Sequence, residues 1–359
     1  MAWTNRTIVM GFYQGIGDFL AAVPTANELL RNGNRVVMVA SRPNVQLAEL
    51  IAFMSPRVQL IELALFSKAP LRSLRLLNVL RRLRPDFVMV SPHAQEQVSS
   101  WKSPLLLWVL KHLAPGRPVV IGSQDEKLSC LYDVRLLVDK ALGLIEREWS
   151  LHRMAGSIEK DAMPDKDVFN RAAVKDYGAP RYDLVVHPGA SRDVKMWPVD
   201  YHRELVRRLD DHLRVAYIGR ASELAPFRAS LGGHRNVEFL VGPINEAVSV
   251  ASGASVVLTM DSGFSYVAAL LGVRHIALFG STDPVVYSPP SQRSTSLYRK
   301  ALPCQPCNQH ACRLSHMACM RIITPGEVAA TVEDALSVGA SVDPVGRTAG
   351  SRSTATTYA

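Results

Sequence analysis

The sequence predicts an α/β protein made of two Rossmann-like domains that face each other across a cleft. The chain has 359 residues, of which 48% are hydrophobic and 20% charged, so it can bury two cores of ordinary size. Short β-branched runs alternate with amphipathic helical stretches, which is the rhythm of a parallel sheet covered by helices. The rhythm occurs twice, on either side of a polar connecting stretch from Glu159 to Asp176.

The apolar runs in each half are expected to be strands, and the stretches between them helices or loops. In the first half we expect strands at Thr7–Met10, Arg35–Ala40, Val58–Leu63, Phe87–Val90 and Val119–Gly122, and helices at Phe19–Leu30, Asn44–Phe53 and Leu71–Leu83. In the second half we expect strands at Tyr182–His187, Val215–Ile218, Val237–Leu240, Ser255–Met260 and His275–Phe279, and helices at Pro198–Leu209 and Phe264–Leu271. The predicted domains are residues 1–165 and 166–338, followed by a disordered tail at 339–359 that is rich in Gly, Ser, Thr and Ala.

Charge and hydropathy narrow the classes of partner. The formal charge of +9 and the pI near 9.4 favour anionic partners. Aromatic residues interleaved with basic ones, as in a platform for single-stranded nucleic acid, are absent, so no nucleic-acid partner is expected. A basic stretch with Arg72, Arg75, Arg81, Arg82 and Arg84 is either a solvated helix face or a patch for an acceptor or a membrane surface. No apolar run reaches the roughly 18 residues of a membrane span, and the first 13 residues lack the regions of a signal peptide, which predicts a cytoplasmic protein.

A glycine-rich turn follows the first expected strand. Gly15 and Gly17 allow a ligand to approach the backbone closely, as in dinucleotide-binding loops. Leu20 stands where that fingerprint needs its third small residue, so an NADP-dependent oxidoreductase is the weakest hypothesis. Asp18 lies near the start of the first helix, where it is either an N-cap or a carboxylate that takes a proton from an acceptor hydroxyl.

Two loops of the second half could hold an anion. His187 to Ser191 ends one strand and is followed by Lys195, whose charge and whose neighbour Ser191 can bind phosphate oxygens. Asp261-Ser262-Gly263 stands between a buried strand and a helix. The amides of Ser262 and Gly263 would then point from the positive end of that helix, which suits a diphosphate.

Four of the five cysteines, Cys304, Cys307, Cys312 and Cys319, fall in one short stretch. Since the cytosol keeps thiols reduced, we favour a structural zinc or iron at this cluster, with free thiols and disulfides as alternatives. The isolated Cys130 is expected to be buried. Asp165-Lys166-Asp167 matches the Asp-x-Asp pattern of metal-dependent sugar transferases, but it lies in the connecting stretch and is interpreted as solvated.

With these motifs in view, the chain resembles the bacterial lipopolysaccharide heptosyltransferase family, glycosyltransferase family 9, up to about residue 338. The matching motifs occur in order along the chain: Gly15-Ile16-Gly17-Asp18 with Pro24, His187-Pro188-Gly189-Ala190 with Lys195-x-Trp197-Pro198, Asp261-Ser262-Gly263, Phe279-Gly280-Ser281-Thr282 with Pro284, and the cysteines before Thr324-Pro325. Each motif is loose alone, but five in this order are specific.

The resemblance implies the GT-B type of fold, an acceptor site in the first domain, and a site for ADP-heptose in the second. It implies that the sugar is transferred with inversion and without a catalytic metal. The acceptor would be a hydroxyl of a lipopolysaccharide core or of a related anionic glycan or glycolipid, and the protein would contact the inner membrane peripherally. By resemblance, Asp18 is the general base and Lys195, with the Asp261–Gly263 loop, holds the diphosphate. Glu223 resembles the acidic residue that holds the donor ribose.

One position departs from the family. Tyr266 stands where the family usually has His, on the helix face that looks at the donor, and a tyrosine hydroxyl cannot become cationic near neutral pH. Donor identity therefore stays open. The alternative hypotheses are a sugar-nucleotide 2-epimerase of the same architecture and a non-catalytic subunit that binds a sugar nucleotide or carries a metal.

Overall fold

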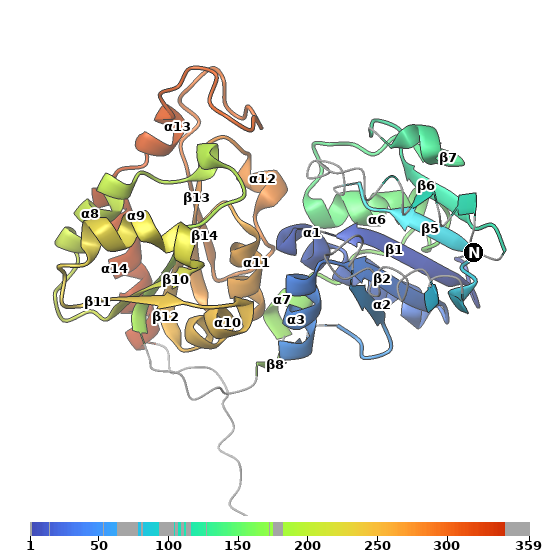
Figure 1. Cartoon of the computed structure of the whole chain (residues 1–359), viewed down its shortest axis with the longest axis horizontal. Coiled ribbons are helices and arrows are strands. Elements are labelled where there is room, and N and C mark those ends of the chain that lie inside the picture. Colours follow the sequence, from blue (N-terminus) through green and yellow to red (C-terminus); the bar gives the residue numbers. More distant parts are fainter. Residues whose placement is uncertain are drawn as a thin grey trace, which may run out of the picture.

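The computed structural model describes residues 2–13, 15–52, 54–62, 78–79, 82–92, 104, 107–108, 111–112, 116–126, 128–171, 173–174 and 182–341. Two lobes, each built on a six-stranded sheet, lie side by side (Figure 1). The first sheet contains β1 (Thr7–Tyr13), β2 (Arg35–Ala40), β4 (Gln59–Glu62), β5 (Phe87–Val90), β6 (Val119–Ser123) and β7 (Val134–Leu136). The second contains β9 (Tyr182–His187), β10 (Val215–Gly219), β11 (Val237–Val241), β12 (Ala254–Met260), β13 (Arg274–Phe279) and β14 (Ser294–Tyr298).

Both sheets are parallel and have the same strand order. The order is β4-β2-β1-β5-β6-β7 in the first lobe and β11-β10-β9-β12-β13-β14 in the second, which is the doubly wound Rossmann order in each case. The direction of winding reverses between β1 and β5, and again between β9 and β12. Such sheets bind ligands outside the carboxyl ends of the strands at this reversal. The predicted fold class is confirmed, and it places two candidate ligand-binding edges in one molecule.

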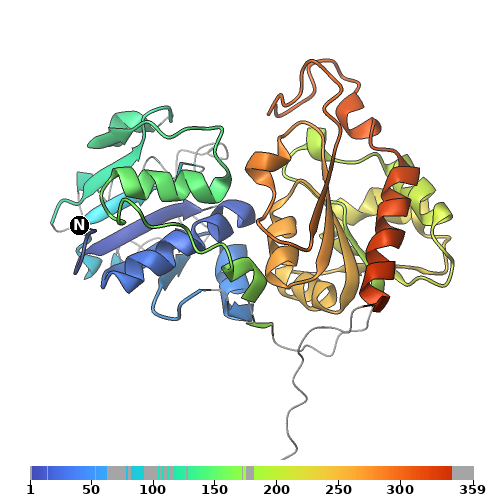
Figure 2. The ribbon, with the colours of Figure 1, turned by 180° about the vertical axis from the view of Figure 1, so that it is seen from behind.

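Helices cover both faces of each sheet (Figures 1 and 2). The first lobe has α1 (Ile16–Ala21), α2 (Val23–Arg31), α3 (Arg42–Leu50), the short helix η1 (Ser129–Leu131) and α6 (Leu144–Met154). The second has η2 (Asp193–Lys195), α8 (Val199–Arg208), α9 (Ala221–Leu231), α10 (Ile244–Ser252), α11 (Gly263–Leu270), α12 (Pro284–Tyr287), α13 (Ala318–Arg321) and α14 (Pro325–Ser341). In the described part of the chain, none of these helices has the length and apolarity that crossing a membrane requires.

Some boundaries differ from the sequence predictions. The single helix expected at 19–30 is two helices that meet at Ala22, because Pro24 in the first turn of α2 has no N–H to donate to an earlier turn. The helix expected from Asn44 to Phe53 ends at Leu50, where a short strand begins. Helix α14 reaches Ser341 and so enters the predicted tail, of which residues 342–359 lie outside the described residues. Most of the helix predicted at 71–83, including Arg72, Arg75 and Arg81, also lies outside them.

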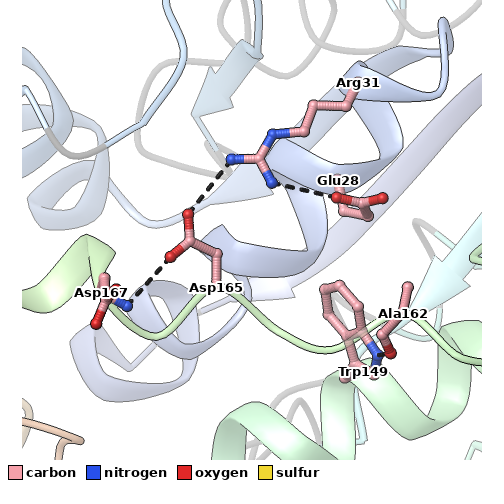
Figure 3. A network of polar contacts seen from close by, with 6 residues as sticks. All are labelled: Glu28, Arg31, Trp149, Ala162, Asp165 and Asp167. Atoms are coloured by element: carbon pink, nitrogen blue, oxygen red, sulfur yellow. Dashed lines mark hydrogen bonds and ion pairs between the residues drawn. The ribbon is translucent and has the colours of Figure 1, made fainter.

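The connecting stretch folds back on the first lobe. Asp165 accepts a hydrogen bond from Arg31 of α2 at 3.3 Å and one from the backbone of Asp167 at 3.2 Å (Figure 3). Trp149 of α6 donates to the carbonyl of Ala162 at 3.1 Å in the same view. The expectation of a solvated Asp-x-Asp is therefore right for the exposed Asp167 and wrong for the half-buried Asp165, which anchors the connection.

Beyond this anchor, the chain passes between the lobes. Helix α7 (Val168–Arg171) packs on α11, and β8 (Ala173–Val174) pairs antiparallel with β3 (Ile51–Ala52). The ring of Phe169 lies edge-on to that of Tyr266, with 5.7 Å between the ring centroids. One buried apolar cluster therefore extends from the helices of the first sheet, through α7, to α11 of the second lobe.

The lobes meet in a backbone contact between α1 and α11, whose first turns face each other (Figure 1). A Cβ atom placed on Gly263 would lie 2.7 Å from the Cβ of Ile16 and 2.8 Å from the backbone nitrogen of Gly17. Only glycine fits at position 263, because backbone atoms cannot move aside as the end of a side chain can. The contact brings the start of α1, with Asp18, against the start of α11.

We expect Gly263→Ala to destabilise the protein by about 1–3 kcal/mol, the usual effect of overpacking, as the two lobes are pushed apart. Gly17→Ala should be tolerated, because a Cβ there would lie 3.6 Å from the Cα of Gly263, an ordinary van der Waals contact. Gly233→Ala is the control, since nothing lies within 4 Å of a Cβ at that exposed position. Denaturant unfolding of the three variants tests the contact. Equal unfolding midpoints for Gly263→Ala and Gly233→Ala would show that the lobes do not meet here.

Candidate active site

The site residues of the first lobe follow β1 at its carboxyl end. Gly15 is the N-cap of α1, the helix has no side-chain cap, and Asp18 occupies its first turn in a half-buried position. The interpretation of Asp18 as an N-cap is therefore wrong. The side chain of Asn44 donates to the carbonyls of Tyr13 and Gly15, both at 3.2 Å, which fixes the backbone of the turn that carries Asp18.

A buried polar network that the sequence analysis missed lies beside this turn. Glu148 of α6 is fully buried and accepts hydrogen bonds from the hydroxyls of Tyr13 at 2.7 Å and Ser91 at 2.8 Å. Tyr13 ends β1 and Ser91 follows β5, so Glu148 joins the two strands at the point where the winding reverses. Burial, together with the charges of Glu148 and Asp18, raises the pKa of Tyr13 well above its ordinary value. The sequence signal that could have revealed this network is the pair Glu148 and His152, which stand four residues apart on the buried face of α6.

In the second lobe, Lys195 and Asp261 form a buried ion pair. Their Nζ and Oδ2 atoms are 2.7 Å apart, and the side chains are only 9% and 8% exposed. The hydroxyl of Thr282 also donates to Asp261. Asp261 therefore positions Lys195 and balances part of its charge, and it does not itself contribute a donor to a phosphate. This pair, at the ends of segments far apart in sequence, was predicted to converge and does so.

Helix α11 begins two residues after Asp261, and the polar groups at its start are the backbone N–H groups of Ser262 and Gly263 and the hydroxyl of Ser262. In the described part of the chain, no acceptor is found for the backbone N–H groups of Ser262 and Gly263, and the buried hydroxyl oxygen of Ser262 has no hydrogen-bonding partner. A helix N-terminus with unsatisfied donors is a ready site for an anion. Buried polar atoms without partners are rare in proteins and often mark the place of a ligand.

A stacked pair of rings joins the end of β9 to α11. The ring of His187, at the end of β9, lies parallel to that of Phe264, with 4.5 Å between the centroids. Burial lowers the pKa of His187, although the charge of Glu223 opposes this. The imidazole is therefore neutral near pH 7, and its buried Nδ1 atom has no partner within the described residues.

Glu223 lies against the glycine loop that follows His187. Its carboxylate accepts hydrogen bonds from the backbone and the guanidinium of Arg220, at 2.9 and 2.6 Å. A Cβ on Gly189 would be 3.3 Å from the Cδ atom of Glu223, so the carboxylate closes on this loop. Burial acts to raise the pKa of Glu223, but the hydrogen bonds and charge of Arg220 outweigh it and keep the pKa below its usual range. An ionised carboxylate at this strand end can accept bonds from hydroxyl groups.

Tyr266 lies between the lobes. Its ring borders Gly17, because a Cβ on that glycine would lie 3.7 Å from the Cδ2 of Tyr266, and its hydroxyl donates to the carbonyl of Ser288 at 3.4 Å. Burial raises the pKa of this hydroxyl, and the charges of Asp18, Glu146 and Asp261 raise it further. The hydroxyl therefore stays protonated among carboxylates of both lobes. Tyr266 donates one hydrogen bond, as expected, but to the protein.

One predicted residue and one hollow of the structure are not part of this cluster. Ser191 is exposed, and in the described structure no hydrogen bond joins it to Lys195 or Asp261. A hollow of about 430 Å³ lies between the connecting stretch and the loop around Ser288, lined among others by Lys166, Asp167 and Ser296. Neither Lys195 nor Asp261 lines it, so it is separate from the ion pair.

The cysteine stretch projects from the second lobe beside α13 (Figure 1). All five cysteines lie in the described part and are unpaired thiols, which is contrary to the disulfide alternative, and Cys130 is exposed, contrary to expectation. Burial raises the pKa of Cys319, and the charges of the other three thiols raise it further. Within the described residues, however, no three Cys, His, Asp or Glu side chains are placed to hold a metal ion.

The model of glycosyltransferase family 9 (heptosyltransferase) matches residues 74–318, more than half of the chain. The chain belongs to glycosyltransferase family 9. The expected family and its enzyme class, glycosyltransferase, are thus confirmed. The matched segment includes Lys195, Asp261 and three of the four clustered cysteines, while Asp18 lies before it and Cys319 directly after it.

Curated relatives of family 9 match shorter segments. Lipopolysaccharide heptosyltransferase 1 of Escherichia coli K12 is 33% identical over 109 residues, 30% of this chain and 34% of that protein. The enzyme of the same name from Pseudomonas aeruginosa is 30% identical over 141 residues, 38% of this chain and 39% of that protein. A lipooligosaccharide heptosyltransferase 2 of Campylobacter jejuni is 35% identical over 71 residues, 20% of this chain and 22% of that protein. The chain spans about a fifth to two fifths of the relatives it matches.

Solved structures of two heptosyltransferases and of another glycosyltransferase share the fold over almost the full length of this chain. ADP-heptose lipopolysaccharide heptosyltransferase II of E. coli has a TM-score of 0.67 at 20% identity, covering 93% of this chain and 99% of that one. E. coli heptosyltransferase WaaC with ADP-2-deoxy-2-fluoro heptose has a TM-score of 0.62 at 21% identity, covering 91% and 99%. The iron-containing dodecameric glycosyltransferase TibC of E. coli has a TM-score of 0.56 at 16% identity, covering 94% and 80%.

Proposed function

We propose that this family 9 member is an inverting glycosyltransferase that moves a heptose from ADP-heptose to a hydroxyl of a lipopolysaccharide-core or related glycan. The observation that carries the proposal is the juxtaposition of α1 and α11. Through the contact of Gly17 with Gly263, a half-buried carboxylate on one lobe adjoins an unsatisfied helix N-terminus and a buried lysine on the other. A base next to an anion site is what displacement of a nucleoside diphosphate needs.

In the proposed reaction Asp18 takes the proton of the acceptor hydroxyl. The hydroxyl oxygen then forms a bond to the anomeric carbon, while the bond from that carbon to the diphosphate oxygen breaks on the opposite face, which inverts the configuration. ADP leaves with the electron pair of the broken bond. No step involves a metal ion.

Negative charge develops on the diphosphate as it leaves, and the second lobe supplies the compensating groups. The amides of Ser262 and Gly263 donate to phosphate oxygens, and Lys195, held by Asp261, contributes positive charge in a site with little water. The stacked rings of His187 and Phe264 come from the end of β9 and from α11, and Glu223 follows the next strand, β10. We assign the rings to the base and Glu223 to the ribose. We assign Ser191 a peripheral position because it is exposed.

We propose the corresponding division of the chain, with acceptor binding in residues 1–165 and donor binding in 166–338. The net charge of +9 suits an anionic glycolipid acceptor at the cytoplasmic surface of the inner membrane. A non-catalytic sugar-nucleotide-binding subunit would need the same donor contacts but not Asp18, so the role of this carboxylate separates the two hypotheses.

Asp18→Asn should reduce turnover by about 10² to 10⁴-fold while donor affinity stays unchanged, because Asn cannot take the proton. Asp200→Asn is a matched control, since exposed Asp200 also lies in the first turn of a helix, α8, and both variants lose the same favourable interaction with a helix dipole. Transfer from ADP-heptose and ADP affinity are measured at a pH where the carboxylate is ionised. Wild-type turnover of Asp18→Asn would remove it as the base.

Lys195→Gln should weaken ADP binding by about 10- to 100-fold, the range for loss of a charge-assisted hydrogen bond, and leave adenosine binding unchanged. Gln is chosen because it can still donate to Asp261, whereas Ala would leave that buried carboxylate unpaired. Lys300→Gln, at an exposed position, is the control. Calorimetry with both ligands decides. Equal losses of ADP and adenosine affinity would assign Lys195 a structural role only.

We further propose that the four clustered cysteines bind one structural zinc or iron ion. Their proximity supports this, although the loop from 304 to 319 would have to draw the thiols together, because no ready ligand set exists in the described residues. Protein purified without chelator should contain about one equivalent of zinc plus iron. Cys319→Ser should lose the metal and exposed Cys130→Ser should retain it. Less than a few tenths of an equivalent, with free thiols titrating, would contradict the site.

A further inference from the structure

A second buried cation lies at the lobe boundary, on the first lobe. Arg147 of α6 is 6% exposed, and its guanidinium donates to the carbonyl of Leu142 through Nε at 2.8 Å and to that of Lys140 through Nη2. These two bonds fix the plane of the guanidinium. Within the described residues, no hydrogen bond or ion pair of its Nη1 group to a carboxylate is found. The charge of Arg147 is thus held rigidly but is not neutralised by a contact with an acidic side chain.

Arg147 reaches the donor lobe through an aromatic ring. Its Cζ atom is 5.9 Å from the ring centroid of Tyr287, on α12 of the second lobe, and the Nζ of Lys195 is 5.3 Å from the same centroid. Helices α6 and α12 face each other across the lobe boundary, next to α1, in both views (Figures 1 and 2). The charge of Arg147 also acts to lower the pKa of the Tyr266 hydroxyl, which burial and the charges of Asp18 and Asp261 raise. One cation from each lobe therefore borders the same ring, next to the start of α11.

We propose that Arg147 is a diphosphate-binding residue that the first lobe contributes to the donor site, completing a two-cation site with Lys195 around Tyr287. A diphosphate carries more negative charge than Lys195 can balance, since Asp261 already neutralises part of that charge. A guanidinium with a fixed plane suits phosphate oxygens. The donor site is then complete only when the lobes are together, so that diphosphate binding and the alignment of Asp18 depend on the same closed arrangement. This inference rests on the proposed function.

Calorimetry with ADP, AMP and adenosine tests the assignment on the full chain. Arg147→Gln should weaken ADP binding by at least tenfold, AMP binding less, and adenosine binding not at all, because only the diphosphate would contact the guanidinium. Arg147→Lys keeps the positive charge but loses the planar guanidinium with its several N–H donors, so its ADP affinity should lie between those of Arg147→Gln and wild type. Arg153→Gln, at an exposed position of the same helix, should bind all three ligands as wild type does.

The outcomes distinguish this inference from the function on which it rests. Wild-type protein that binds ADP, with Arg147→Gln binding it equally well, would overturn the assignment and leave the proposed function intact. Two other results would also overturn the assignment, because they would mean that Arg147 only holds residues 140–147 in place. One is an equal loss of affinity for ADP and for adenosine. The other is a loss of ADP affinity in Arg147→Lys as large as in Arg147→Gln, together with a lowered unfolding midpoint. Wild-type protein that binds none of the adenine nucleotides would overturn both.

Discussion

The backbone contact between α1 and α11 is the constraint on which the rest of the site depends. Helix α1 begins after the carboxyl end of β1, and α11 begins after the carboxyl end of β12. Both strands lie where the winding of their sheet reverses, so each lobe alone would have only one half of the site, exposed to solvent. Glycine at 263 lets the two edges meet at backbone distance. Because α7 and Tyr266 pack beside the contact, the same buried cluster that stabilises the lobe interface also sets the spacing between Asp18 and the donor side.

Charged groups around this contact are buried, and each has a structural reason to be tolerated. Lys195 is paired with Asp261, Glu148 accepts two hydroxyl hydrogen bonds, and Arg147 donates to backbone carbonyls. Burying a charge is costly unless it is paired and hydrogen-bonded, so these arrangements destabilise less than isolated ions would. They also limit side-chain movement. In a site with little water, groups fixed before the reaction stabilise developing charge without having to reorganise.

The sequence was sufficient to predict the fold and part of the site. Continuous apolar runs at strand spacing predicted parallel sheets, and the loops with Asp18, Lys195 and Asp261 were predicted because each follows such a run. Glu148 and Arg147 were missed, since neither belongs to a motif. The importance of Glu148 comes from its contacts with the ends of β1 and β5, and that of Arg147 from its approach to the other lobe. The break at Ala22 could have been inferred from Pro24. The position of Tyr266 could not, because it depends on α7, a four-residue helix in a polar stretch.

A crystal structure of the chain with ADP bound tests the central claim, that the two lobes form one site around the start of α11. We predict the β-phosphate within hydrogen-bonding distance of the amides of Ser262 and Gly263 and of Lys195, with Asp18 facing the space where the sugar would continue. The adenine would lie near the stacked rings of His187 and Phe264. Density for ADP in the hollow beside Ser288 and Ser296, or on a face of the second lobe remote from α1, would contradict the account.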